Sequence, residues 1–191
     1  MKNSYIVTAE ESFLIKEGHI KAFYEIVNPQ PKPSDVSKIG GTDRYSIFKA
    51  DDVEQIDKPY EIGQEIYLRE PFKKLFFGDK PEIIYAAGIG KVDADIMQNY
   101  KWTSAATMPK SAARTFIKIV SVQCKRMKEI NADDLDNLGY RGTLGYSPIW
   151  YQEYEEQAIA KYGQPVWDNN PFIWIVNFEL IQVVDSEILS K

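Results

Sequence analysis

The sequence has a single cysteine, Cys124, and a single histidine, His19, among its 191 residues. One cysteine excludes a disulfide framework, and the two residues together leave no cluster of zinc-type ligands. We therefore expect no metal site and no cofactor. A Ser-His-Asp triad would have to use His19, which lies near the end of a predicted helix and is better explained as a solvated helix-end residue.

Long apolar runs are also missing. No stretch of 18 apolar residues is present, and the start, Met1 to Ser4, lacks the apolar core of a signal peptide. These two absences predict a cytoplasmic protein with no membrane partner.

Positive charge is scarce overall but concentrated in one window. The net charge of −5 argues against strong, sequence-blind binding to duplex nucleic acid, which depends on many cation–phosphate contacts. One window, 101–128, has no acidic residue, and its seven positive charges leave −12 for the rest of the chain. Its basic residues are Lys101, Lys110, Arg114, Lys118, Lys125, Arg126 and Lys128. This window is the first candidate surface for an anionic ligand, with binding expected to weaken as salt rises. A solvated face is the alternative explanation.

Hydrophobic residues make up 44% of the chain and aromatic residues 13%, which is ample for a packed core. No repeat and no linker divides the sequence, so we expect one α+β domain over 1–191. Loop or insertion segments are expected near 28–45, where prolines recur, and near 88–101, where two glycines open a polar stretch.

Periodicity and capping signals predict the elements. The expected helices are Ala9–Glu17, with a Thr8–Glu11 capping box, Ala132–Leu138 behind Asn131, and Pro148–Tyr162, whose aromatic stripe we assign to the core. A weak helix is predicted over 51–58, and turns or loops at 141–146 and 167–171. The expected strands are Ser4–Val7, Ile20–Val27, Ser46–Lys49, Glu65–Arg69, Ile83–Ala87, Ser111–Gln123 and Phe172–Val184.

The stretch Tyr60–Phe72 carries the clearest candidate site. Glu65 to Arg69 alternates polar and apolar residues, and Pro71 stops strand pairing, so Arg69 and Glu70 lie side by side where a strand leaves its sheet. A rigid strand aims such side chains at a ligand. The alternative is that Arg69 and Glu70 form structural ion pairs.

Several segments, in chain order, resemble ASCH domains of the phage and prophage type, small β-barrels of the PUA-like superfamily. They are Ile20-Lys21, Val27–Pro31, Gly63–Glu70, Lys101–Ser104, Met108-Pro109-Lys110 with Arg114, Trp150, and Trp167–Trp174. The resemblance implies a PUA-like mixed β-barrel with flanking helices. It also implies the host cytoplasm as the location, if the chain is phage-encoded.

The resemblance further implies three alternative functions. The first is binding of RNA or a modified nucleotide in a cleft beside the barrel, with Tyr67, Arg69, Glu70, Trp102, Lys110 and Arg114 as ligand-binding residues. The second is a protein-interaction factor on a decayed ASCH scaffold, one whose ligand motif has been lost. The third is an amidohydrolase acting on an acylated cytidine, with Lys21 and Glu70 as catalytic residues.

One segment departs from the family pattern. The family motif Lys-Thr-x-Thr-Arg-Arg is replaced here by Lys21-Ala22-Phe23-Tyr24-Glu25, which keeps the lysine and lacks both threonines and both arginines. This departure favours binding over catalysis.

Overall fold

The computed structural model describes residues 1–32, 36–38, 45–47, 58–77, 80–88, 101–140 and 148–184. The chain divides into two compact units. Unit 1 contains residues 20–62 and 119–178 with Met1, and unit 2 contains residues 2–19, 63–118 and 179–191. The predictions for 51–57 and 141–147, and most of the two predicted insertions, at 33–35, 39–44 and 89–100, lie outside the described residues.

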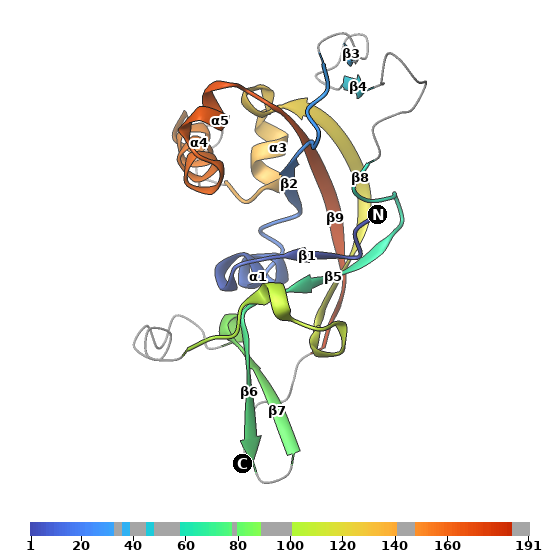
Figure 1. The fold of residues 1–191 in the computed structure, drawn as a ribbon, viewed down its shortest axis with the longest axis vertical. Coiled ribbons are helices and arrows are strands. Elements are labelled where there is room, and N and C mark those ends of the chain that lie inside the picture. Colours follow the sequence, from blue (N-terminus) through green and yellow to red (C-terminus); the bar gives the residue numbers. More distant parts are fainter. Residues whose placement is uncertain are drawn as a thin grey trace. The chain divides into compact units, whose positions relative to one another are not determined.

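In unit 2 a short strand and a helix open the chain (Figure 1). Strand β1 (Ser4–Ile6) runs parallel to β5 (Glu65–Arg69), which pairs antiparallel with the start of β8 (Thr115–Arg126). Helix α1 (Ala9–Lys16) begins with the predicted capping box, in which Thr8 and Glu11 exchange hydrogen bonds of 3.1 and 2.7 Å. Strands β6 (Phe72–Phe77) and β7 (Lys80–Tyr85) form a separate antiparallel hairpin.

Four short 3-10 helices occur among the residues that the structure describes. Three belong to unit 2, and the fourth, which follows β8, belongs to unit 1. They are Ala86–Gly88, Ala105–Thr107, Lys110–Ala112 and Met127–Glu129.

In unit 1 strand β2 (Ala22–Ile26) pairs antiparallel with β9 (Phe172–Val183). The short strands β3 (Val36–Lys38) and β4 (Tyr45–Ile47) form a hairpin, and Tyr45 pairs with Cys124 of β8. Helices α3 (Ala132–Asn137), α4 (Pro148–Tyr162) and α5 (Gln164–Asp168) lie on one side of β2 and β9 (Figure 1).

The fold class predicted from sequence, α+β, is confirmed. Seven strands belong to one mixed sheet, in which β8 and β9 pair with each other and each contribute residues to both units. No strand pairing closes this sheet within the described residues, so the PUA-like barrel stays a proposal.

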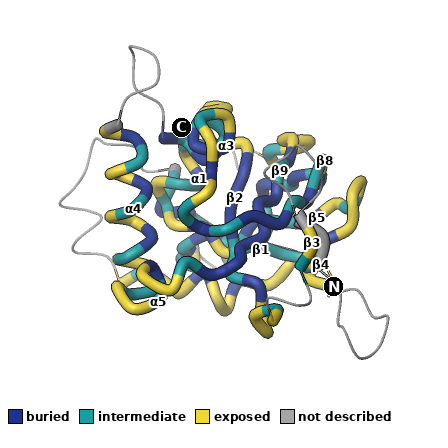
Figure 2. Tube along the Cα trace, turned by 90° about the horizontal axis from the view of Figure 1, so that it is seen from above, coloured by how far each residue is buried: buried dark blue, intermediate teal, exposed yellow. Residues whose placement is uncertain are grey.

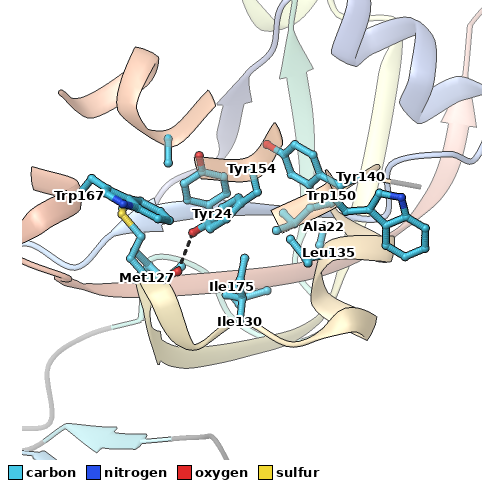
Figure 3. Packing of buried hydrophobic residues seen from close by; sticks show 13 residues of the cluster. Ala22, Tyr24, Met127, Ile130, Leu135, Tyr140, Trp150, Tyr154, Trp167 and Ile175 are labelled. Atoms are coloured by element: carbon cyan, nitrogen blue, oxygen red, sulfur yellow. Dashed lines mark hydrogen bonds between the residues drawn. The ribbon is translucent and has the colours of Figure 1, made fainter. Parts of the chain in front are cut away.

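Aromatic side chains form the core of unit 1. Tyr154 of α4 contacts the rings of both Tyr24 of β2 and Trp167 of α5, and Met127 and Ile175 belong to the same cluster (Figure 3). The Tyr154 hydroxyl is buried and donates to the carbonyl of Met127 at 3.0 Å. The predicted core role of the α4 stripe is confirmed, and the tube of α4 alternates between buried and exposed bands (Figure 2).

Several predictions of local structure were wrong in part, including the strand Ile83–Ala87, whose last two residues lie in the 3-10 helix Ala86–Gly88. The segment 167–171 was predicted as a turn, but Trp167 lies in α5, because a new helix begins at Gln164, with Pro165 in its first turn, and Trp167 fills the core. Strand β8 begins at Thr115, after a 3-10 helix, and continues to Arg126. Strand β3 occupies part of the predicted 28–45 loop because it pairs with β4.

Thr115 is fully buried in unit 2, and its hydroxyl has no hydrogen-bond partner among the residues that the structure describes. An unsatisfied buried polar group lowers stability, and an apolar group of the same shape avoids that cost. We therefore expect Thr115→Val to raise the free energy of unfolding by about 1 kcal/mol. Urea denaturation measures it, with exposed Thr103→Val as a control expected to stay within about 0.5 kcal/mol. A loss of stability in Thr115→Val would show that the hydroxyl has a partner.

Cys124 is buried on β8, and this burial raises the pKa of its thiol to about 12, with the charge of Arg126 acting in the opposite direction. In the unfolded chain the thiol ionises near pH 8.5. The folded state favours the protonated thiol, so this preference stabilises the fold fully below about pH 8.5. The stabilisation is lost as the pH rises towards 12, where the buried thiol also ionises. At pH 9 we expect iodoacetamide to alkylate Cys124 slowly in the native protein and rapidly in urea. Equal rates would contradict this burial.

Candidate functional site

The carboxylate of Glu70, the main candidate from sequence, is fully buried in unit 2 and completely engaged by protein groups. Arg114 binds it with two hydrogen bonds of 2.9 Å, from Nε to Oε1 and from Nη2 to Oε2. The Ser12 hydroxyl of α1 donates to Oε2 at 3.0 Å, and Lys16 Nζ lies 3.9 Å from Oε1. Glu70 therefore ties α1 to the segment that leads into β8.

Arg114, the partner of Glu70, is also buried and contacts a second side chain. Its guanidinium carbon lies 4.0 Å from the ring centre of Tyr85, whose hydroxyl donates to the carbonyl of Ala112 at 2.7 Å. Burial raises the pKa of the Tyr85 hydroxyl, the charge of Arg114 lowers it and that of Glu70 raises it. Only 6% of Arg114 is exposed. Glu70 and Arg114 are thus brought together, but as an internal ion pair.

The other ligand-binding candidates of unit 2 do not converge on this pair through any contact that the structure describes. Arg69, predicted as a ligand-binding residue or a member of a structural ion pair, donates from Nη1 to the carbonyl of Ala106 at 2.9 Å. Tyr67 and Trp102 are half-buried, and Lys110 is exposed at the start of a 3-10 helix.

Five of the seven basic residues in the window 101–128 are engaged. Arg114 and Lys125 are buried in ion pairs, and Lys118 pairs with Glu179 at the surface. Arg126 and Lys128 lie over the rings of Phe172 and Trp167. Two of the seven charges, Arg114 and Lys125, are therefore buried and are not part of a cationic surface, while Lys118, Arg126 and Lys128 are partly exposed and Lys101 and Lys110 are exposed.

Unit 1 contains a polar cavity of about 390 Å³ that the sequence did not predict. The residues that line it come from β8, β9, α3 and the segment before β2. They are Lys21, Val120, Ser121, Gln123, Lys125, Asn131, Asp133, Asp134, Asn137, Asn177 and Phe178. Lys21, a candidate only under the amidohydrolase interpretation, is therefore at this cavity, and Glu70 belongs to unit 2.

The cavity arises from a change of residue type along one face of β8. Alternate residues share a strand face, so the apolar residues Ile117 and Ile119 are followed on that face by Ser121, Gln123 and Lys125. In β9 the face with the core residues Ile173 and Ile175 continues to Asn177 in the same way. On β9 the cavity residue Asn177 thus follows two residues of the apolar core of unit 1 on the same strand face.

Two backbone hydrogen bonds and one ion pair fix the wall that α3 provides. The amide of Lys21 donates to the carbonyl of Asn137 at 2.7 Å, and the amide of Phe178 donates to the carbonyl of Lys21 at 2.9 Å. At the start of α3, Asp134 accepts from the backbone of Asn131 at 3.0 Å and from the buried ammonium of Lys125. The cavity is therefore bounded by fixed backbone.

The charges that line the cavity cancel, since two lysines and two aspartates contribute to it. Four carboxamides and one serine hydroxyl supply most of its remaining polar groups. Such a site recognises a ligand by hydrogen bonds more than by net charge. The sequence signal that marks it is a polar interruption of two strong strand patterns, at Ser121 with Gln123 and at Asn177.

Among the described residues there is no group of three or more His, Cys, Asp or Glu side chains placed to hold a metal ion. Within the same part of the chain, no helix is long and apolar enough to cross a membrane.

No family model matches the chain, and no curated protein matches it. A comparison with solved structures finds protein EF3133 from Enterococcus faecalis V583, of the family DUF984. It is 10% identical, with a TM-score of 0.45, over 99% of this chain and 86% of that one.

Proposed function

We propose that this chain binds RNA or a nucleotide, and that the base enters the polar cavity of unit 1. The observation that carries the proposal is the cavity itself, which combines about 390 Å³ of space with amide and hydroxyl groups from three elements. Amide side chains form paired hydrogen bonds with base edges, and Lys21, which also lines the cavity, can contact the 2′-hydroxyl or phosphate of a ribonucleotide. The resemblance to ASCH domains, which hold nucleotides beside a PUA-like barrel, supports the same class of ligand.

The family and its setting belong to the same proposal. We propose that the chain is an ASCH-type protein of phage or prophage origin that acts in the host cytoplasm. The support is the sequence resemblance from Ile20 to Trp174, together with a mixed sheet in which β1, β5, β8, β9 and β2 pair in succession. A closed barrel would require further strand pairing.

The amidohydrolase alternative has one supporting observation, which is the position of Lys21 at the cavity. Its second residue, Glu70, is fully occupied by Arg114 and Ser12 within unit 2. A carboxylate neutralised in this way is poorly suited to acid–base chemistry on a ligand. We therefore favour binding over hydrolysis.

The experiment is a titration of the ¹⁵N-labelled protein with cytidine, adenosine, their 5′-monophosphates and a short single-stranded RNA. We expect amide shifts at Ser121, Gln123 and Asn177 and none at Glu70 or Arg114. Because the lining charges cancel, nucleoside affinity should change little with salt, whereas each phosphate contact adds a log–log slope of about −0.7. If none of these probes shifts the cavity residues, the proposed function is wrong.

A further inference from the structure

The Ser121 hydroxyl, which lines the cavity, accepts hydrogen bonds from two other lining residues. Its oxygen accepts from Asn177 Nδ2 at 2.9 Å and from Gln123 Nε2 at the longer distance of 3.5 Å. A hydroxyl oxygen has two lone pairs and one hydrogen, so these two bonds use its whole accepting capacity. Ser121 can then act only as a donor towards a third group.

No acceptor for the Ser121 hydrogen is found among the residues that the structure describes. Ser121 and Asn177 are half-buried and both line the cavity, so the hydrogen has access to a bound molecule. The side-chain amides of Asn177 and Gln123 each donate one N–H to Ser121. Their carbonyl oxygens, Asn177 Oδ1 and Gln123 Oε1, remain as acceptors for a bound molecule. These three side chains therefore offer the cavity one hydroxyl donor and two amide carbonyl acceptors.

We propose that Ser121, Gln123 and Asn177 are the specificity-determining residues of the cavity, and that they select a heterocycle with an amine next to a ring-nitrogen acceptor. This inference rests on the proposed function. An amine brings two N–H donors for the two amide carbonyls, and the adjacent ring nitrogen accepts from Ser121. Cytosine and adenine present this edge. Uracil presents one N–H donor between two carbonyl acceptors, which leaves one amide carbonyl unmatched.

Deleting the acceptor atom from the ligand tests the role of Ser121. In the wild-type protein we expect 3-deazacytidine to bind about tenfold more weakly than cytidine, or 1-deazaadenosine than adenosine, because the Ser121 donor is left unmatched. In Ser121→Ala the affinities for each nucleoside and its deaza analogue should become equal within about twofold. The control Ser111→Ala, at an exposed site in unit 2, should keep the tenfold difference.

Calorimetry gives the affinities, and urea denaturation on the same preparations gives the stabilities. A Ser121→Ala variant that loses stability but keeps the tenfold difference would show that Ser121 only supports the amides, and would overturn the inference. So would uridine binding as tightly as cytidine and adenosine. In both cases nucleosides still bind and the proposed function stands. If no nucleoside binds the wild-type protein, the proposed function and this inference both fail.

Discussion

Glu70→Gln is expected to lower the free energy of unfolding by about 3–5 kcal/mol, because it leaves the buried guanidinium of Arg114 without its counter-charge. The glutamine keeps the shape of the side chain and one acceptor oxygen, so the loss comes mainly from the charge. Ser12 and Lys16 lose their contacts with a carboxylate in the same step. Chemical denaturation followed by circular dichroism measures the change.

A double variant separates the ion pair from packing. Replacing both partners, with Glu70→Leu and Arg114→Met, removes both buried charges, and we expect it to be less destabilised than the sum of the two single variants. Glu65→Gln, at an exposed position of β5, the strand that ends just before Glu70, is the matched control and should change stability by no more than about 0.5 kcal/mol. A Glu70→Gln variant as stable as this control, with weakened nucleotide binding, would instead make Glu70 a ligand-binding residue.

Lys125→Met is the second change with a large expected effect. We expect it to lower the free energy of unfolding by about 3–5 kcal/mol. Lys125 is 1% exposed and Asp134 is 6% exposed, so the variant leaves a buried carboxylate without a cation. Methionine preserves most of the volume of the lysine stem, which limits the effect of packing. The carboxylate would keep its cap on α3, where it accepts from the backbone of Asn131 at 3.0 Å.

The control for Lys125 is Lys118→Met on the same strand. Lys118 pairs with Glu179, but their side chains are 45% and 56% exposed, and a surface pair contributes at most about 1 kcal/mol. The double variant Lys125→Met with Asp134→Leu should be more stable than Lys125→Met alone, because no unpaired buried charge is left. It should still lose about 1 kcal/mol of stability, because Asp134 no longer caps α3. Equal effects of Lys125→Met and Lys118→Met would show that the Lys125–Asp134 pair is not desolvated.

Local signals in the sequence were enough to determine several elements. Thr8 with Glu11 and Asn131 with Asp134 both form capping boxes, because a capping box involves residues only three positions apart. The alternation over Glu65–Arg69 gave the bounds of β5, and Pro148 with the aromatic spacing gave those of α4. These features depend on backbone geometry and on neighbours along the chain.

Only the tertiary structure decided which charges pair and where the cavity lies. Glu70 lies beside Arg69 in the sequence, but it binds Arg114, 44 residues away. Successive residues of an extended chain point to opposite faces, so adjacency in sequence does not predict contact. Ser121 and Asn177 are 56 positions apart and meet because β8 and β9 pair. A polar residue in a strand becomes part of a site only when a second strand brings it a partner, and that pairing is a long-range property of the fold.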